Sequence, residues 1–554
     1  MARFFRAAIF VAFFLYAGNV FAAGGTCPNG ANYLSSSMDA LRLPLVTLNN
    51  LGVTNCYFIA ASGSDSNTGT DEEHPWAHLP GMSTCTGNCA AHTPAAGDGY
   101  IFRGGDTWQG SNLGIYWHWS GTTSNPVYIG VDPTWSSGGS WSRPIWTCGG
   151  AACSGGSSGY FWQSPTNVSH YILDDIELTG LVDSGNAPNY VNLYGTYNTA
   201  ERLYIHGWRT TRNDNSPSQA FGMAAGAPNQ GATLRYNVID GADTAQNMMF
   251  VTHSGTPIAY GNVIYNVYTG LDGCGDDWHD NLLDNAMVQG VVTGHQDGLY
   301  HVTQCYNSSS LIYNNVIRNT TNPLTGGAVK LWLNGNAPCP FSSCTSYMFN
   351  NIIYNTYPGN TFDTGGHFAQ NYGTWYIFNN TIDCGTDSVQ GDCSELSDRG
   401  NTGGTMTLIR LNNQYISTGS LSNDCTHYTC SQTGDLVQSL SSANAQGYSS
   451  TSPFAFQPTT ASAPTITAAA KVTTAATRLS LCTTIGAIDA SAGAACQSDT
   501  TYACTYETPT HDVRCPARST VARAAEPNIG AYQFTSSIQG SSPEPPLGLT
   551  VSVQ

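Results

Sequence analysis

The chain has 554 residues, of which only 10% are charged, and its 36 acidic residues outnumber its 18 basic ones for a formal net charge of −18. Nucleic acid is therefore not expected as a partner, because binding it needs a basic surface. Tyr, Trp, Asn, Ser and Gly are abundant, which is typical of extracellular β-proteins and suits contact with neutral sugars.

The amino terminus predicts export. Arg3 and Arg6 precede an apolar run over residues 7–17, and Val20-Phe21-Ala22 forms a small-residue cleavage site before Ala23. This pattern is typical of a signal peptide, which we assign to residues 1–22. No later stretch has the length of apolar sequence that a membrane span requires, so we predict a secreted or cell-surface protein, extracellular or periplasmic.

Residues 23–159 are rich in Trp and in turn-forming residues, and we predict that they form an amino-terminal cap and the first coils of a repeat. From residue 160 to 420 a short phrase recurs, in which an apolar residue and one or two Asn precede a small hydrophobic pair. It occurs at Tyr236-Asn237-Val238-Ile239, Gly261-Asn262-Val263-Ile264, Tyr313-Asn314-Asn315-Val316-Ile317, Phe349-Asn350-Asn351-Ile352-Ile353, Phe378-Asn379-Asn380-Thr381-Ile382 and Leu411-Asn412-Asn413-Gln414-Tyr415-Ile416.

The spacing of this phrase predicts a solenoid. The last Asn recurs after 25, 53, 36, 29 and 33 residues, counted from Asn237 to Asn413, and the step of 53 implies two turns, one of them degenerate. Each phrase is too short and too β-branched for a helix, so each is a strand. Asn tolerates the left-handed backbone conformation, and one Asn per coil predicts stacked bends that form a ladder of amides.

These residues resemble the pectin-lyase-like superfamily of parallel β-helix proteins. The Ser-Gly-Ser-Asp-Ser-Asn-x-Gly-Thr loop at residues 62–70, the Gly-Asp-x-hydrophobic-x-hydrophobic-Arg-Gly-Gly-Asp segment ending at Asp106 and the closing phrase at residues 526–534 are also similar to segments of secreted bacterial β-helix proteins. The resemblance implies an all-β, right-handed parallel β-helix with an amino-terminal capping region and a disulfide-rich carboxy-terminal region. Residues 421–535 would supply the last coils and a cap, with low complexity at 439–477.

The 18 cysteines fall into nine pairs of sequence neighbours, and an exported chain favours structural disulfides over zinc sites. The spacing alone does not determine the connectivity. The predicted pairs are Cys27–Cys56, Cys85–Cys89, Cys148–Cys153, Cys274–Cys305, Cys339–Cys344, Cys384–Cys393, Cys425–Cys430, Cys482–Cys496 and Cys504–Cys515.

Titratable residues are densest between residues 272 and 301. Taking Tyr300 and Val302 as inward places His295, Asp297, Leu299 and His301 on the outer face of one strand. Offsets of 33 and 37 residues, which resemble coil lengths, then stack Lys330 and His367 beside them. We predict catalytic roles for His295, Asp297, His301 and Lys330, and substrate binding by Trp332, His367 and Arg318.

Two mechanisms fit this set. In a lyase, Lys330 or a His removes the proton beside a uronate carboxylate, and Asp276, Asp277 and Asp280 offer oxygen ligands to calcium, the candidate cofactor. In a hydrolase, Asp297 acts with Asp277 or Asp280 as a pair of carboxylates. The alternative to a catalytic role for these residues is a solvated loop between two disulfide-bonded cysteines, or a structural calcium site.

The function hypotheses are therefore a secreted polysaccharide lyase or glycoside hydrolase and, alternatively, a non-catalytic surface, adhesive or self-assembling protein, because fold alone does not determine function. The expected partner is an extracellular polysaccharide. Residues 536–554 form a Pro-rich tail with one alternating strand at Leu549, Val551 and Val553, through which self-association is a hypothesis.

Overall fold

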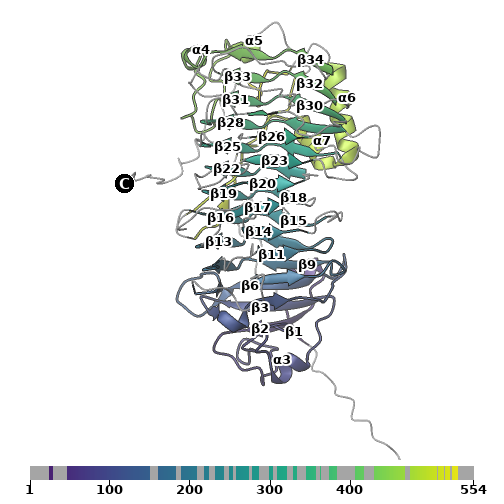
Figure 1. Cartoon of the computed structure of the whole chain (residues 1–554), viewed down its shortest axis with the longest axis vertical. Coiled ribbons are helices and arrows are strands. Elements are labelled where there is room, and N and C mark those ends of the chain that lie inside the picture. The colour runs from purple at the N-terminus through teal and green to yellow at the C-terminus, as the bar shows by residue number, and fades with distance from the viewer. Residues whose placement is uncertain are drawn as a thin grey trace, which may run out of the picture.

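The chain forms a parallel β-helix, seen along its length in Figure 1. The structure is a computed structural model. It describes residues 24–28, 47–149, 160–182, 189–208, 218–223, 231–241, 249–253, 257–273, 277–285, 298–302, 309–320, 329–332, 345–356, 362–363, 373–383, 406–416, 429–467, 475–507, 510–516, 518–524 and 527–534. The predicted signal peptide and Pro-rich tail lie outside these residues.

Successive coils contribute one strand to each of three parallel sheets. The first sheet contains, in spatial order, β1 (Gly25–Thr26), β2 (Asn55–Ile59), β3 (Asp98–Gly104), β6 (Val127–Ser136), β9 (Tyr171–Asp174), β12 (Thr199–Glu201), β15 (Thr233–Arg235), β18 (Ile258–Tyr260), β21 (Asp277–His279), β24 (Leu311–Tyr313), β27 (Thr345–Phe349), β30 (Gly373–Phe378), β32 (Met406–Leu411) and β34 (Thr429–Thr433). Only β1 runs antiparallel to its neighbour among these strands.

The second sheet follows the first around each bend. It contains β4 (Thr107–Gln109), β7 (Ile145–Thr147), β10 (Glu177–Thr179), β13 (Tyr204–His206), β16 (Val238–Asp240), β19 (Val263–Tyr265), β22 (Leu282–Asp284), β25 (Val316–Arg318), β28 (Ile352–Tyr354), β31 (Thr381–Asp383), β33 (Gln414–Ile416) and β35 (Leu436–Gln438). The coils thus begin before residue 160 and continue beyond residue 420.

The third side of the coils carries two sheet segments. The first contains β5 (Ile115–Tyr116), β8 (Trp162–Ser164), β11 (Asn189–Leu193), β14 (Ser218–Gly222) and β17 (Met249–His253), and the second contains β20 (Leu271–Gly273), β23 (Leu299–Val302), β26 (Val329–Trp332) and β29 (Phe362–Asp363). The Val251 amide donates to the Thr269 carbonyl, and Thr252 Oγ1 donates to the Asp272 carbonyl, so β20 lies beside β17. We call this continuous side the third sheet; it faces the viewer in Figure 1.

The predicted amide ladder is confirmed, and the two residues of each Asn pair have different roles. Asn314, Asn350, Asn379 and Asn412 have left-handed backbones, with φ between 54° and 60°. The Asn that follows each of them is a buried rung: Asn315 Nδ2 donates to Asn351 Oδ1 at 3.0 Å, and the Asn315 amide donates to the same oxygen at 2.9 Å. Asn281 is the rung of the degenerate coil that the 53-residue step implied.

The ladder ends on a carboxyl group instead of an amide. Asp435 Oδ1 accepts from the Asn413 amide at 2.7 Å and from Asn413 Nδ2 at 3.1 Å. Burial raises the pKa of Asp435 to about 6. This coil lies one turn beyond the last phrase found in the sequence.

The carboxy-terminal segment runs back along the outside of the helix. The disulfide Cys482–Cys496 joins α6 (Ala475–Ile488) and α7 (Ala490–Cys496), which cover the outer face of the first sheet, including Tyr313 and Phe349. Two short helices, α4 (Leu440–Ala445) and α5 (Pro464–Thr467), lie within the predicted low-complexity stretch and contribute buried residues to a cluster over the second sheet.

The last part of this segment reaches an early coil. β36 (Thr505–Tyr506) pairs with β37 (Val513–Arg514), and Arg143 forms ion pairs with Asp175 at 2.8 Å and with Asp512 at 2.9 Å. The remaining short helices are α2 (Leu48–Leu51), α3 (Gly87–Ala91) and a 3₁₀ turn, η1 (Gly110–Asn112), near the amino-terminal end.

Four predicted disulfides are confirmed: Cys27–Cys56, Cys85–Cys89, Cys482–Cys496 and Cys504–Cys515. Cys148 and Cys430 are also disulfide-bonded. The other predicted pairs have at least one member outside the described residues. Within the described residues, no helix is long and apolar enough to cross a membrane.

Candidate functional site on the third sheet

The predicted catalytic and binding residues that the structure describes are divided among all three sheets. His301, Lys330 and Trp332 lie in β23 and β26 of the third sheet. Asp277 begins β21 within the first sheet, Asp280 follows that strand at the bend, and Arg318 ends a strand of the second sheet. His295, Asp297, His367 and Asp276 lie outside the described residues.

The strand phase from which these residues were assigned is wrong. Leu299, which we expected to face outward, is fully buried in the main core. The register also differs, because Lys330 pairs with Tyr300, and His301 pairs with Leu331. The predicted offset of 33 residues placed Lys330 beside Asp297, whereas the observed offset is 330 − 300 = 30. A shift of this kind changes every neighbour of a residue within a sheet.

The observed register brings four functional side-chain types into one row across the third sheet. Asp272 pairs with Tyr300, Tyr300 with Lys330, and Lys330 with Asp363. Neighbouring strands lie about 4.8 Å apart, so Lys330 occupies the position between a Tyr and an Asp. We call Asp272, Tyr300, Lys330 and Asp363 the Lys330 row.

Sequence reasoning missed most of this row. Asp272 belonged to the run of titratable residues, but Tyr300 was taken as inward together with Val302 from the period-two alternation of the strand. Asp363 lies in a strand of two residues, β29, which is too short to show any periodicity. The signal that finds Tyr300 is the apolar Leu299, which is the inward residue of β23.

Asp277 and Asp280 line a different concavity. A pocket of about 840 Å³ lies between the first sheet and the carboxy-terminal segment, and its walls include His279, Thr501 and Arg518. His279 lies between the rings of Tyr260 and Tyr313, at centroid distances of 4.8 and 4.6 Å. This stack continues through Phe349 and Phe378.

The carboxylate of Asp280 links strand β21 to the carboxy-terminal segment. Its Oδ2 lies 2.6 Å from His279 Nδ1, and its Oδ1 accepts a hydrogen bond from the Thr501 hydroxyl. Among the described residues, no group of three or more His, Cys, Asp and Glu side chains is arranged to hold a metal ion. Calcium binding by Asp276, Asp277 and Asp280 therefore stays a prediction.

Arg318 has protein partners for all three of its guanidinium nitrogens, and Nη2 lies 2.8 Å from Asp284 Oδ2. Nε donates to Asp284 Oδ2 at 2.8 Å, and Nη1 donates to the Tyr354 hydroxyl at 3.2 Å. These neighbours hold the pKa of Arg318 above its ordinary value, although burial opposes the charge. The side chain thus joins neighbouring coils of the second sheet through an ion pair with Asp284.

Comparison with known proteins assigns no family to this chain. No protein-family model matches the sequence, and no curated protein matches it. Among solved structures, a rhamnogalacturonan lyase is 14% identical, with 69% of this chain and 87% of that chain covered and a TM-score of 0.37. The pectate lyase Pel9A is 13% identical, with coverages of 63% and 78% and a TM-score of 0.32.

A lacto-N-biosidase from Eubacterium ramulus is 11% identical, with coverages of 69% and 68% and a TM-score of 0.31. At identities and TM-scores this low, we transfer neither the activity nor the substrate of these proteins to this chain. The class of protein is determined by its own sheets, and it is a parallel β-helix.

Proposed function

We propose that this protein is an exported carbohydrate-active enzyme that acts on a polysaccharide at the third sheet. The observation that supports this function best is the Lys330 row, in which register places a Lys between a Tyr and an Asp. The chain contains one other lysine, Lys471, so a Lys at this position is not explained by a generally basic composition.

The spacing within the row favours a lyase over a hydrolase. Asp272 and Asp363 are separated by three strand steps, or about 14 Å along the sheet, whereas paired catalytic carboxylates lie about 5 to 9.5 Å apart. Tyr300 and Lys330 are one step apart, close enough to act on the same sugar. A lyase needs a group that takes a proton and a cation that stabilises the resulting negative charge.

In this proposal Lys330, which is next to Asp363 in the strand register, supplies the cation beside the substrate carboxylate. Tyr300 transfers the proton, because a neighbouring ammonium group favours a phenolate. The C–H bond beside the carboxylate breaks, a carbon–carbon double bond forms and the glycosidic oxygen leaves with a proton. By strand alternation His301 shares the inward face of β23 with Leu299, so in this proposal Tyr300 also returns the proton to the leaving oxygen, and His295 and Asp297 stay predictions.

The test is turnover by the mature chain on a polysaccharide panel, with unsaturated products and new reducing ends recorded separately. We expect unsaturated products from at least one uronate-containing polymer, and we expect Lys330→Ala and Tyr300→Phe to lower the rate at least a hundredfold. The matched control is Tyr197→Phe, which alters an exposed tyrosine at the turn between β11 and β12. Reducing ends without unsaturation would instead establish a hydrolase.

One observation favours assembly as a second candidate function. Strand β34 ends the first sheet among the described strands, and its residues Thr429, Ser431, Gln432 and Thr433 are exposed and uncharged. Edges of this kind pair readily with other chains. If the protein turns over no sugar, a concentration-dependent mass in light scattering that Gln432→Lys abolishes would support assembly through β34.

A further inference from the structure

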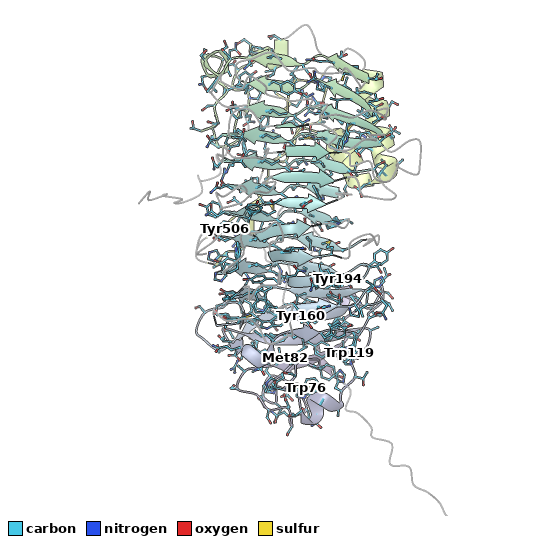
Figure 2. The ribbon with its side chains drawn as sticks, viewed as in Figure 1. Trp76, Met82, Trp119, Tyr160, Tyr194 and Tyr506 are labelled. Atoms are coloured by element: carbon cyan, nitrogen blue, oxygen red, sulfur yellow. A yellow bond between two sulfur atoms is a disulfide. The ribbon has the colours of Figure 1, made fainter. Side chains whose placement is uncertain are left out.

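The third sheet carries an exposed aromatic surface at its amino-terminal end, far from the Lys330 row. We define the aromatic–amide band as Tyr116, Tyr160, Gln163, Asn189, Asn192 and Tyr194. Figure 2 labels Tyr160 and Tyr194 on the same face as the third sheet, near Trp119. Tyr116 is 46% exposed, which makes it one of the few large hydrophobic side chains in the described residues that face solvent.

Strand register arranges the centre of the band as a single row. Tyr116 of β5 pairs with Gln163 of β8, and Gln163 pairs with Asn192 of β11. Their strand neighbours Trp162 and Val191 are buried in the main core. One aromatic ring and two amides thus follow each other along the helix axis at intervals of about 4.8 Å.

Two further tyrosines flank this row. Burial raises the pKa of the Tyr160 phenol, and the nearby Tyr116 phenol adds to the shift. Burial also raises the pKa of the Tyr194 phenol, which Asn189 opposes through a side-chain hydrogen bond. Both tyrosines are partly buried, so each presents part of its ring and hydroxyl at the surface.

The two asparagines of the band hold each other in place, and Asn192 is buried with 5% of its surface exposed, so Gln163 is the amide of the central row that a ligand can reach. Asn189 Nδ2 donates to Asn192 Oδ1 at 2.8 Å, and Asn189 Oδ1 accepts no hydrogen bond from any described residue. The next position in the row is Gly222, where a Cβ atom would come within 2.0 Å of Asn192 Oδ1. Only glycine leaves the two amides where they are.

We propose that the aromatic–amide band binds a neutral segment of a polysaccharide. Its residues carry no charge, so it has no group with which to pair a uronate or an ammonium ion. Aromatic faces contact the C–H faces of sugar rings, while amides and phenols hydrogen-bond their hydroxyls. A protein partner is the alternative occupant, and binding of no glycan would count against the polysaccharide.

This inference rests on the proposed function for its setting, because both sites lie on one sheet. Seven strand steps separate β5 from β26, or about 34 Å. A ligand that contacts both sites must therefore be a polymer, with a neutral stretch remote from the bond that is cleaved. Binding energy from such a remote segment can be used to position the reacting sugar.

The experiment measures binding without turnover. The mature protein is run in native gels that contain a soluble β-glucan, a xylan, a galactomannan or polygalacturonate, at low and high salt. We expect at least one neutral polymer to retard the protein equally at both salt concentrations, because no ionic contact is involved. Tyr116→Asn should weaken this binding about tenfold, which corresponds to loss of about 1.4 kcal/mol.

The matched control is Tyr197→Asn, which removes another exposed tyrosine, 52% accessible, at a position whose positive φ Asn tolerates. Gly222→Ala should weaken binding through the displaced amides while Tyr116 is retained. Lys330→Ala should bind like the unmodified chain, so loss of turnover there cannot be mistaken for loss of this site. No retardation by any neutral polymer, or equal retardation of the Tyr116→Asn variant, would overturn the proposal.

Discussion

Substitution of a ladder asparagine tests whether the buried amides hold the coils together. Asn315 Oδ1 accepts one hydrogen bond from the main-chain N–H of Asn281 at 3.1 Å and another from Asn281 Nδ2 at 3.0 Å. Asn315 Nδ2 donates to the Trp278 carbonyl at 2.8 Å. In Asn315→Ala, the main-chain N–H of Asn281 and the main-chain carbonyl of Trp278 both lose their hydrogen bond to the Asn315 side chain, in a site with no solvent access.

The expected loss follows from these two groups. A buried main-chain group that loses its partner costs about 2 kcal/mol, so the free energy of unfolding should fall by about 4 kcal/mol. The measurement is chemical denaturation followed by circular dichroism, with the denaturant dependence checked for a change in slope.

The adjacent asparagine provides the control. Asn314 has φ of 56°, and its role in the bend is conformational, so Asn314→Gly should change the unfolding free energy by less than about 0.5 kcal/mol. Equal losses in the two variants, or a loss below about 1 kcal/mol for Asn315→Ala, would refute the division of roles within each Asn pair.

Three other predictions concern the end of the ladder and the carboxy-terminal segment. The raised pKa of Asp435, about 6 against its ordinary 3.8, means that the folded state holds the proton more tightly; the resulting stability is fully present below about pH 4 and is lost as pH rises through 6. In the parent chain the free energy of unfolding should therefore fall by about 3 kcal/mol between these pH values, and in Asp435→Asn this fall should be absent. A plot of unfolding free energy against pH with the same slope in both chains would contradict the assignment. Replacing Cys482 and Cys496 with Ser removes a disulfide of sequence separation 14 and should cost about 3 kcal/mol, seen in thermal unfolding against the oxidised parent chain. Arg143→Met leaves the buried Asp175 and the partly exposed Asp512 without this cation and should make the segment after residue 498 more sensitive to limited proteolysis, mapped by mass spectrometry; identical cleavage in both chains would show that this contact does not hold the segment.

Much of the fold was predictable because its signals are local. An Asn that adopts a left-handed bend and an Asn that forms a buried rung both leave a mark in the sequence of several coils, as Asn350 and Asn351 show. The rung at Asn281 was implied by spacing alone, although its neighbours depart from the phrase. The ladder residue Asp435 was missed because a carboxyl group replaces the amide.

The candidate site was predictable only in part, because it depends on register between distant strands. Lys330 and its strand were identified, but its neighbours Tyr300 and Asp363 were not. Loops of variable length separate successive strands of the third sheet, so sequence offsets do not translate into register. The aromatic–amide band was missed for the same reason, since Tyr116 and Gln163 are 47 residues apart in sequence.

The sequence by itself determined that this protein is a disulfide-bonded parallel β-helix with a ladder of asparagines, since the Asn-containing phrase recurs from coil to coil. Only the tertiary structure decided which residues share a sheet and a row. It placed Asp277 and Asp280 beside the carboxy-terminal segment and Lys330 on the third sheet. The physical reason is that strand alternation is a short-range property, whereas register is set by how whole coils close and pack against each other.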